Sequence, residues 1–360
     1  MTAVIITLII SGIIYKGDDP MQITYNTSNV KKMNMELIRV VIKTMPGNTK
    51  AGIAAVTGLS HATCNNLLNE MVVAGEVLEL DKENKSGGRP SQRYEYNSNF
   101  FNILSLYIDN DSKKTALRYA VFNLIGEILE EEAFYKEHMD YQSIDDVIAQ
   151  VLQKHPVIKA IGIGIPGVIL KQRFIHTCDV QSLSDCPMAN HLEKRFGIKT
   201  LLENDMNATA IGIYQEQDYE EEASIAVMTF IKDNFPGSGI IVNGHILRGY
   251  TNFAGEIAFL PYDRTRQQME EMLSESSTTL PLIVKSISSM IAIINPETII
   301  LTGTLITENM LDEIQRQVEE VIAKEHMPHI IFKESIHKFY LKGLMTISMN
   351  NLSGSFKAKL

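Results

Sequence analysis

The chain has 360 residues, of which 45% are apolar and 21% charged, and this length is enough for two or three globular domains with a large core. The formal net charge of −10 excludes binding to nucleic acid through an overall positive charge, so any such contact must come from a local module. Three cysteines, Cys64, Cys178 and Cys186, form no CxxC spacing or paired framework, which is typical of a reducing cytoplasm and argues against a structural zinc site.

The first twenty residues are unusually apolar. No Lys or Arg precedes the run MTAVIITLIISGIIY, and the following KGDDP offers no convincing cleavage site, as a signal peptide would. The run is also shorter than a typical membrane span. We therefore expect residues 1–29 to be an N-terminal extension, with Met21 as the true start and no membrane partner. A membrane or export segment is the alternative.

The next segment differs in charge from the rest of the chain. Residues 31–95 hold nine Lys or Arg and seven Asp or Glu, a net charge of +2, whereas residues 96–360 carry −11. Helical spacing of apolar residues predicts a first helix around 37–42, which Pro46-Gly47 ends. The acidic balance of the whole chain therefore gives no reason to exclude DNA binding by this segment.

Two further short helices are predicted on either side of Gly58. Thr49 and Ser60 are candidate N-caps for these helices. A capped helix, a glycine turn and a second capped helix are typical of a helix-turn-helix, whose second helix enters the major groove. An ordinary helical hairpin with a solvated face is the alternative.

The predicted second helix has a polar but nearly uncharged face, and Asn side chains can bind adenine through two hydrogen bonds. Segments Val77–Leu80 and Arg93–Tyr96 predict a two-stranded wing around Ser86-Gly-Gly-Arg-Pro90, in which Arg89 would enter a minor groove. Together these features predict a winged helix-turn-helix over residues 30–97 that binds double-stranded operator DNA. The predicted DNA contacts are Thr49, Ser60, His61, Thr63, Asn65, Asn66, Asn69, Gly88, Arg89 and Pro90.

From residue 104 the pattern changes to alternating strands and helices, which predicts an α/β protein of two lobes over residues 104–360. Asn243-Gly244 is a predicted hairpin turn, and helices are expected between residues 267 and 294. The first two predicted strands, 104–121 and 123–129, are consecutive strands with a Gly turn. The others cover residues 160–165, 200–202, 225–231, 239–242 and 298–301.

Several motifs in this region, in this order, resemble those of the ROK family of sugar kinases and sugar-responsive repressors. They are GIGIPG at 162–167, ENDMNA at 203–208, GIIVNG at 239–244 with Arg248-Gly249, and AGEI at 254–257. The N-terminal winged helix with its GRP wing resembles the repressor branch, which includes xylose and N-acetylglucosamine repressors. The resemblance implies a two-lobed actin-like ATPase (ribonuclease H-like) fold, a sugar between the lobes, and a homodimer or homotetramer on a paired operator.

The resemblance places the catalytic base of a sugar kinase at Asp205 and sugar contacts at Asn204 and Glu256. The chemistry agrees, because phosphoryl transfer needs a carboxylate within reach of the attacking hydroxyl. A helix cap with no ligand role is the alternative for Asp205.

The nucleotide motifs of the family are degenerate. Residues 109–114, Asp-Asn-Asp-Ser-Lys-Lys, stand in place of DxGGTK, and residues 233–237, Asp-Asn-Phe-Pro-Gly, in place of GTGIG. Thr302-Gly303-Thr304 replaces a triple glycine. A phosphate cradle needs small residues and free backbone N–H groups. We therefore predict no enzyme activity and no cofactor, with Asp205 as a remnant base that accepts hydrogen bonds from a ligand.

The sugar side also departs from the family. Phe259 stands where the family's GEIGH motif has its zinc-binding and sugar-contacting His, and residues 260–268 contain no cysteine, so no metal is predicted. The predicted ligand contacts are Asn204, Asp205, Glu256 and Phe259. A flatter or more apolar ligand and the loss of any ligand both stay open.

The expected function is a cytoplasmic transcriptional regulator, a repressor of carbohydrate-metabolism genes, whose inactive kinase-like domain senses a sugar or a related small molecule. Two alternatives are an active ATP-dependent sugar kinase that carries a DNA-binding domain, and a DNA-binding protein that responds to no ligand.

Overall fold

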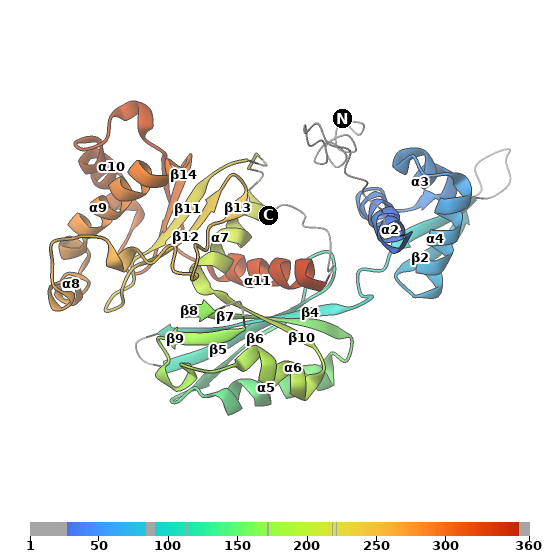
Figure 1. Ribbon diagram of the computed structural model, residues 1–360, viewed down its shortest axis with the longest axis horizontal. Coiled ribbons are helices and arrows are strands. Elements are labelled where there is room, and N and C mark those ends of the chain that lie inside the picture. Colours follow the sequence, from blue (N-terminus) through green and yellow to red (C-terminus); the bar gives the residue numbers. More distant parts are fainter. Residues whose placement is uncertain are drawn as a thin grey trace, which may run out of the picture. The chain divides into compact units, whose positions relative to one another are not determined.

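The computed structural model describes residues 27–83, 91–111, 114–170, 173–217, 219–220 and 222–352 (Figure 1). The chain divides into two compact units, with the boundary between Phe100 and Phe101. Each unit has its own buried core.

The first unit contains three helices and a small antiparallel sheet. The helices are α2 (Thr27–Thr44), α3 (Lys50–Thr57) and α4 (His61–Val73). The strands are β1 (Asn48–Thr49), β2 (Val77–Glu83) and β3 (Ser91–Tyr96), in the order β1-β3-β2. The predicted two-stranded wing is therefore present as β2 and β3, and the short β1 adds a third strand that the sequence pattern did not reveal.

The core of this unit forms where the apolar faces of the three helices meet. Ile42, Ile53, Leu68 and Met71 are fully buried, and Tyr94 from the sheet packs with them. Such burial stabilises the folded state by about 1.5–3 kcal/mol for each large apolar side chain. The helical spacing of apolar residues in the sequence gives each helix one apolar face, and the burial of these faces causes the three helices to pack together.

The second unit contains two five-stranded sheets of the same topology. The first has the order β10-β7-β4-β5-β6 and the second β13-β12-β11-β14-β15. In each, three antiparallel strands are followed by two strands parallel to the first of them. A repeated sheet of this kind is the architecture of the actin-like ATPase fold, so the predicted fold class is confirmed.

The first sheet carries helices on one face. Its strands are β4 (Asn102–Asp111), β5 (Lys114–Phe122), β6 (Ile128–Lys136), β7 (Ile158–Ile165) and β10 (Lys199–Asn204). Helices α5 (Tyr141–Lys154) and α6 (Met188–Phe196) pack their apolar sides against it. A separate ribbon, β8 (Gly167–Leu170) with β9 (Phe174–Cys178), follows β7.

The second sheet is formed by β11 (Ile225–Thr229), β12 (Gly237–Val242), β13 (His245–Ile246), β14 (Thr298–Thr302) and β15 (His329–Phe332). Helices α8 (Arg266–Met272), α9 (Ser276–Ile294) and α10 (Leu311–Glu319) belong to this lobe. In the part of the chain that the structure describes, α9 is the one helix with the length and mean hydropathy, 1.5, of a membrane span. It packs Ile283, Ile287 and Met290 into the core of this lobe, and a core helix meets the same criterion.

Two helices lie between the sheets, α7 (Asp205–Glu216) and α11 (His337–Leu352), and they pack against each other (Figure 1). Glycines allow their backbones to approach closely. A Cβ atom on Gly212 would lie 1.8 Å from the carbonyl oxygen of Phe339, and one on Gly343 would lie 1.9 Å from that of Ala208. This contact fixes the position of α7 and of Asp205 at its N-terminus.

Several predicted elements have different boundaries in the structure. The strand predicted over residues 104–121 is two antiparallel strands, β4 and β5. The predicted Gly turn is present, with Gly126 at a φ of 84°, but it extends over residues 123–127, so the strand expected over 123–129 begins only at Ile128. The side-chain oxygen of Asn123 accepts hydrogen bonds from the N–H groups of Ile125 and Glu127, and these bonds replace a strand ladder. The helical segment predicted over residues 267–294 is interrupted between Met272 and Ser276.

Candidate nucleic-acid interface and ligand site

The caps of the second and third helices lie as predicted. Thr49 Oγ1 accepts a hydrogen bond from Gly52 N at 3.2 Å, and Ser60 Oγ accepts one from Thr63 N at 3.1 Å. Gly58 ends α3 in the left-handed conformation, with a φ of 71°. The helix–turn–helix geometry follows from these three residues, because each cap satisfies N–H groups that a helix end leaves unpaired.

The predicted reading face of α4 is exposed. His61, Asn65, Asn66 and Asn69 lie on the solvent side, opposite the buried Leu68. Asn69 Oδ1 accepts a hydrogen bond from Lys50 Nζ at 2.6 Å. Because Asn69 is held by α3, Asn65 and Asn66 are the better placed of the asparagines to contact a partner.

The remaining predicted DNA contacts fall into two groups. Thr63 is half-buried, and its hydroxyl lies 2.9 Å from that of Ser60. Gly88, Arg89 and Pro90 lie outside the described residues, which stop at Glu83 and resume at Ser91. The minor-groove role of Arg89 stays a prediction.

In the second unit, Asn204 is the N-cap of α7. Its side-chain oxygen accepts hydrogen bonds from Met206 N at 3.0 Å and Asn207 N at 3.1 Å, and its amide donates to the Gly167 carbonyl at 3.1 Å. The structure thus gives the capping role to Asn204 and not to Asp205. The capping bonds hold Asn204 in place, and its ligand contact stays a prediction.

Asp205 begins α7 with its carboxylate in a partly buried position. Burial is the main cause that raises the pKa of Asp205 to about 7, and the negative charges of Asp179 and Glu256 act in the same direction, against backbone hydrogen bonds from Met206 and from Asp205 itself that lower it. A carboxyl group that is half-protonated near neutral pH is suited to both accept and donate a hydrogen bond to a ligand.

Backbone contacts connect the segments that carry Asp179, Asp205 and Glu256 to neighbouring elements of both lobes. Asp179 follows β9, and its N–H donates to the Pro166 carbonyl at 3.0 Å. The carbonyl of Gly255, next to Glu256, accepts from Ser238 N at 2.9 Å and Oγ at 3.0 Å. A Cβ atom on Gly239 would lie 2.0 Å from the Met206 carbonyl, so β12 packs directly against the start of α7.

Two side-chain contacts also link the lobes beside Asp205. Arg248 pairs with the buried Glu203 at 2.6 Å, and Asn252 donates to the Ile169 carbonyl at 2.6 Å. The segment that leads to Glu256 is therefore held against both α7 and the β8–β9 ribbon.

Phe259 is 61% exposed and forms part of an aromatic cluster. Its ring centroid lies 5.1 Å from that of Phe253. The guanidinium of Arg266 lies 3.3 Å from the ring centroid of Phe235 and 5.4 Å from that of Phe259. Arg266 therefore stacks over the phenylalanine that replaces part of the second phosphate loop.

The backbone N–H groups of that loop have internal partners. Lys232 N donates to Thr304 Oγ1, Asp233 N to the Leu273 carbonyl and Asn234 N to the Ile231 carbonyl. Phe235 N donates to Asn234 Oδ1. In a phosphate cradle such groups would point at the nucleotide, whereas here they are bound within the loop and to Leu273 and Thr304 of neighbouring segments.

In the first phosphate loop, Asp109 is the acidic residue that matches the family motif, and it too has a partner within the protein. Asp109 forms an ion pair with Arg118 at 2.7 Å across the β4–β5 hairpin. Ser112 and Lys113 lie outside the described residues.

Protein contacts hold the segment that replaces the family's zinc loop. Tyr262 is buried, and its hydroxyl bonds to Ser286 and to the Ile257 carbonyl. Thr265 and Gln268 form a capping box at the start of α8. In the described ranges there is no group of three His, Cys, Asp or Glu side chains arranged to hold a metal ion.

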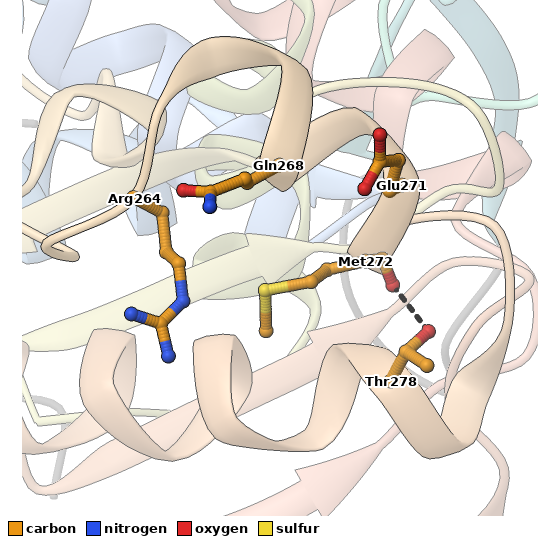
Figure 2. A pocket seen from close by; sticks show the side chains of 5 residues that line it. All are labelled: Arg264, Gln268, Glu271, Met272 and Thr278. Carbon is orange, nitrogen blue, oxygen red and sulfur yellow. Dashed lines mark hydrogen bonds between the residues drawn. The ribbon is translucent and has the colours of Figure 1, made fainter.

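A shallow open depression of about 300 Å³ lies between α8 and α9 (Figure 2). It contains none of the predicted ligand contacts, and the hydroxyl of Thr278 at its edge donates to the Met272 carbonyl. Its lining residues are Arg264, Gln268, Glu271, Met272 and Thr278.

Sequence reasoning did not single out three residues that interact electrostatically with the candidate ligand residues: Asp179 and Tyr340 with Asp205, and Arg266 with Glu256. None of them lies in one of the family motifs. Asp179 follows the second strand of the β8–β9 ribbon, so the signal that was available is an acidic residue one short hairpin after Pro166-Gly167.

Comparisons with known proteins agree with this geometry. The model of the ROK family matches residues 111–271. The xylose repressor of Caldicellulosiruptor bescii is 26% identical over 246 residues, 64% of this chain and 59% of the relative, and that of Bacillus subtilis is 24% identical over 65% of this chain and 62% of the relative. The chain thus spans about three fifths of the length of these relatives. ROK sugar kinases also match, including an N-acetyl-D-glucosamine kinase of Haemophilus influenzae, 26% identical over 43% of this chain and 52% of the relative.

A solved structure extends the similarity to the whole fold. The crystal structure of a ROK family transcriptional regulator, a homologue of the E. coli MLC protein, covers 89% of this chain and 99% of its own, with a TM-score of 0.64 and 16% identity. The two sheets of the same topology, the motif order and these matches agree: over residues 111–271 the chain matches the ROK family, and its fold is that of a ROK family regulator.

Proposed function

We propose that the protein is a cytoplasmic DNA-binding repressor of carbohydrate-metabolism genes. The second unit, a kinase-like domain without activity, would sense a sugar or a related small molecule. One observation carries the proposal: a capped helix-turn-helix occurs in the same chain as a kinase fold whose second phosphate loop is closed by its own hydrogen bonds.

The loss of catalysis follows from this loop. Phosphoryl transfer depends on positioning the nucleotide and stabilising its charge. N–H groups that already have partners cannot stabilise phosphate oxygens, and Phe235 with Arg266 fills the adjacent space. Asp205 retains an acceptor but has no phosphoryl donor, and no metal or cofactor is part of the proposal.

DNA would be read by α4 through His61, Asn65 and Asn66, with the hydroxyls of Thr49 and Ser60 near phosphates. The segment with Gly88, Arg89 and Pro90 would contact the minor groove. We propose a homodimer or homotetramer, because a two-fold protein matches a paired operator. A ligand at Asn204, Asp205, Glu256 and Phe259 would then favour one lobe arrangement and change DNA affinity.

Fluorescence anisotropy of the full chain on the DNA upstream of its own gene tests this proposal. We expect specific binding that one compound from a panel of sugars and sugar phosphates relieves. Specific binding that no compound alters would favour a regulator without a ligand, and absence of specific binding would contradict the DNA-binding role. Saturable binding of ATP would favour the kinase instead.

Base reading by α4 has its own test. Asn65→Ala or Asn66→Ala should reduce discrimination between operator and unrelated DNA by about 1–3 kcal/mol for each bidentate pair of hydrogen bonds that the variant removes. Non-specific affinity should change little. Equal losses on both DNAs would refute base reading, and Arg89→Ala should in contrast weaken binding chiefly at AT-rich positions.

A further inference from the structure

The three carboxylates of the ligand site differ in how well their charge is compensated. Glu256 faces Arg266, whose positive charge lowers its pKa, although burial and Asp179 raise that pKa overall. Asp179 is near Asn234, an uncharged amide, and burial raises its pKa. For Asp205 no positive side chain of the described residues contributes, and burial with both neighbouring carboxylates dominates its pKa. Among the described residues, no positive side chain therefore acts on Asp205, whereas Arg266 lies near Glu256.

A buried hydroxyl that interacts electrostatically with Asp205 also lacks a hydrogen-bond partner among the described residues. Tyr340 is 5% exposed, and no described group forms a hydrogen bond with its hydroxyl. A Cβ atom on Gly164 would lie 2.2 Å from this hydroxyl, and Gly164 pairs with Glu203, two residues before Asp205. A buried hydroxyl without a hydrogen bond costs free energy, which a bound polar group would recover.

The third feature is an aromatic wall on the side of the second lobe. Phe253 and Phe259 are 45% and 61% exposed and contact each other. Arg266 already lies over Phe259, so this wall accommodates a cation within its own structure. Exposed aromatic rings also pack against the apolar face of a sugar-sized ring.

We propose that the site formed by Asp179, Asp205 and Glu256 takes a positively charged ligand, a protonated amine on a sugar-sized ring that packs against Phe259. The size of the ring rests on the proposed sensing function, whereas the charge rests on the carboxylates, the unpaired Tyr340 hydroxyl and the aromatic wall. An ammonium group donates three hydrogen bonds, enough for Asp205, Asp179 and one further acceptor.

A divalent cation is the other source of positive charge, and the geometry favours the amine. Magnesium and calcium require six or more oxygen ligands in a compact shell. Within the described part of the chain no three acidic, His or Cys groups form such a set. An aromatic wall next to the carboxylates would contribute nothing to a metal shell.

Isothermal titration of the full chain with glucosamine, N-acetylglucosamine and glucose at neutral pH tests the proposal. Acetylation removes the charge of the amine and leaves the sugar ring in place. We expect glucosamine to bind at least about ten-fold more tightly than either neutral sugar. Raising the salt concentration should weaken this preference, because the charges are partly accessible to solvent.

Two variants provide the matched comparison. Asp179→Asn keeps the size of the side chain and removes its charge, and it should lower the affinity for glucosamine by about ten-fold or more. Asp185→Asn removes an equal charge from a side chain that is 77% exposed near the same ribbon, and it should leave the affinity unchanged. Equal effects of the two variants would overturn the site and point to a general effect of net charge.

Equal or tighter binding of the neutral sugars would overturn the charge inference, as would the absence of binding by glucosamine. Binding of magnesium ions from magnesium chloride alone, abolished by Asp179→Asn, would show that the site takes a metal ion and not an amine. Anisotropy on operator DNA separates this inference from the proposed function. A neutral sugar that releases the DNA would support the sensing role and refute the charged ligand. Glucosamine that binds without releasing the DNA would support the charged ligand and refute the sensing role.

Discussion

The ligand site and the loop at residues 233–237 lie in the same unit, yet their polar groups are used in opposite ways. In the loop, the N–H groups of Asp233, Asn234 and Phe235 all find partners within the protein. At the ligand site, Asp205 has no cationic partner, and the Tyr340 hydroxyl has no hydrogen bond among the described residues. From this difference we expect the loop to serve the scaffold and the candidate ligand site to bind a small molecule.

The same contrast shows that the kinase-like fold does not require the loops on which catalysis depends. Both sheets keep the topology of an actin-like kinase, and α7 still presents Asp205 at the junction of the lobes. Catalysis depends on a few loop groups outside these sheets, so the fold persists when the loops change.

The largest effect is expected for a variant at the contact between α7 and α11, which positions the candidate ligand site. Gly212→Ala places a methyl group where a Cβ atom would lie 1.8 Å from the Phe339 carbonyl oxygen. Alanine is the better helix former by about 1 kcal/mol, but moving the α11 backbone should cost more, so we expect a net loss of about 2–3 kcal/mol in the free energy of unfolding. Urea unfolding measures it.

Gly197→Ala is the control for this variant. Gly197 has a φ of 67°, and a Cβ atom there would meet nothing within 4 Å. Only backbone strain of about 1–2 kcal/mol is expected. A smaller loss at Gly212 than at Gly197 would show that the close α7–α11 contact does not hold the site.

The second prediction concerns the pH dependence of stability. The pKa of Asp205 is about 7 in the folded protein and near its ordinary value in the unfolded chain, so the folded state binds more protons between these values. The free energy of unfolding should therefore fall as pH rises from about 4 to 7, by an amount on the order of 1–3 kcal/mol. Asp205→Asn should remove this part of the dependence, measured by urea unfolding at pH values across that window. An unchanged slope in the variant would mean that Asp205 ionises freely.

The third prediction applies to the closed loop. Phe235→Ala removes a half-buried ring and its contact with Arg266, and we expect a loss of about 1–2 kcal/mol in unfolding free energy. Opening this space should not create nucleotide binding, because the N–H groups keep their partners. Titration with a fluorescent ATP analogue tests this, and saturable binding by the variant would show that the ring alone excludes the nucleotide.

The smallest effect is expected at Thr304→Val. The variant removes the acceptor of the Lys232 N–H, which donates to Thr304 Oγ1 at 2.9 Å. Lys232 and Thr304 are exposed, so water replaces most of this bond and we expect a loss of less than about 1 kcal/mol. Faster hydrogen exchange at the Lys232 amide would be the direct readout, and an unchanged rate would contradict the closed loop.

The sequence predicted the fold class and the positions of most strands, because apolar patterns and Gly or Pro punctuation report local conformation. Thr49, Ser60, Gly58 and the Asn243-Gly244 turn show this, since each acts through neighbouring backbone groups. A Gly turn was predicted within residues 123–129, but its extent over 123–127 was not, because hydrogen bonds to Asn123 override the strand-like apolar residues.

The site was predicted less completely, for a physical reason. Asn204, Asp205, Glu256 and Phe259 were identified through motifs, and their ligand roles stay predictions. Asp179, Arg266 and Tyr340 join the site only through long-range packing, which a single sequence does not encode in any local spacing. The expected ends of the N-terminal extension at residue 29 and of the DNA-binding domain at residue 97, and the expected start of the effector domain at residue 104, also stay predictions.

The most direct measurement is the binding of operator DNA by the wild type and by Asp205→Asn, followed by anisotropy with and without the compound that relieves the wild-type complex. We predict equal DNA affinity for both proteins without the compound and loss of the response in the variant, with no effect of ATP on either. A normal response in the variant would place the sensing site elsewhere, and release of the DNA by ATP would contradict the claim that the nucleotide region has become scaffold.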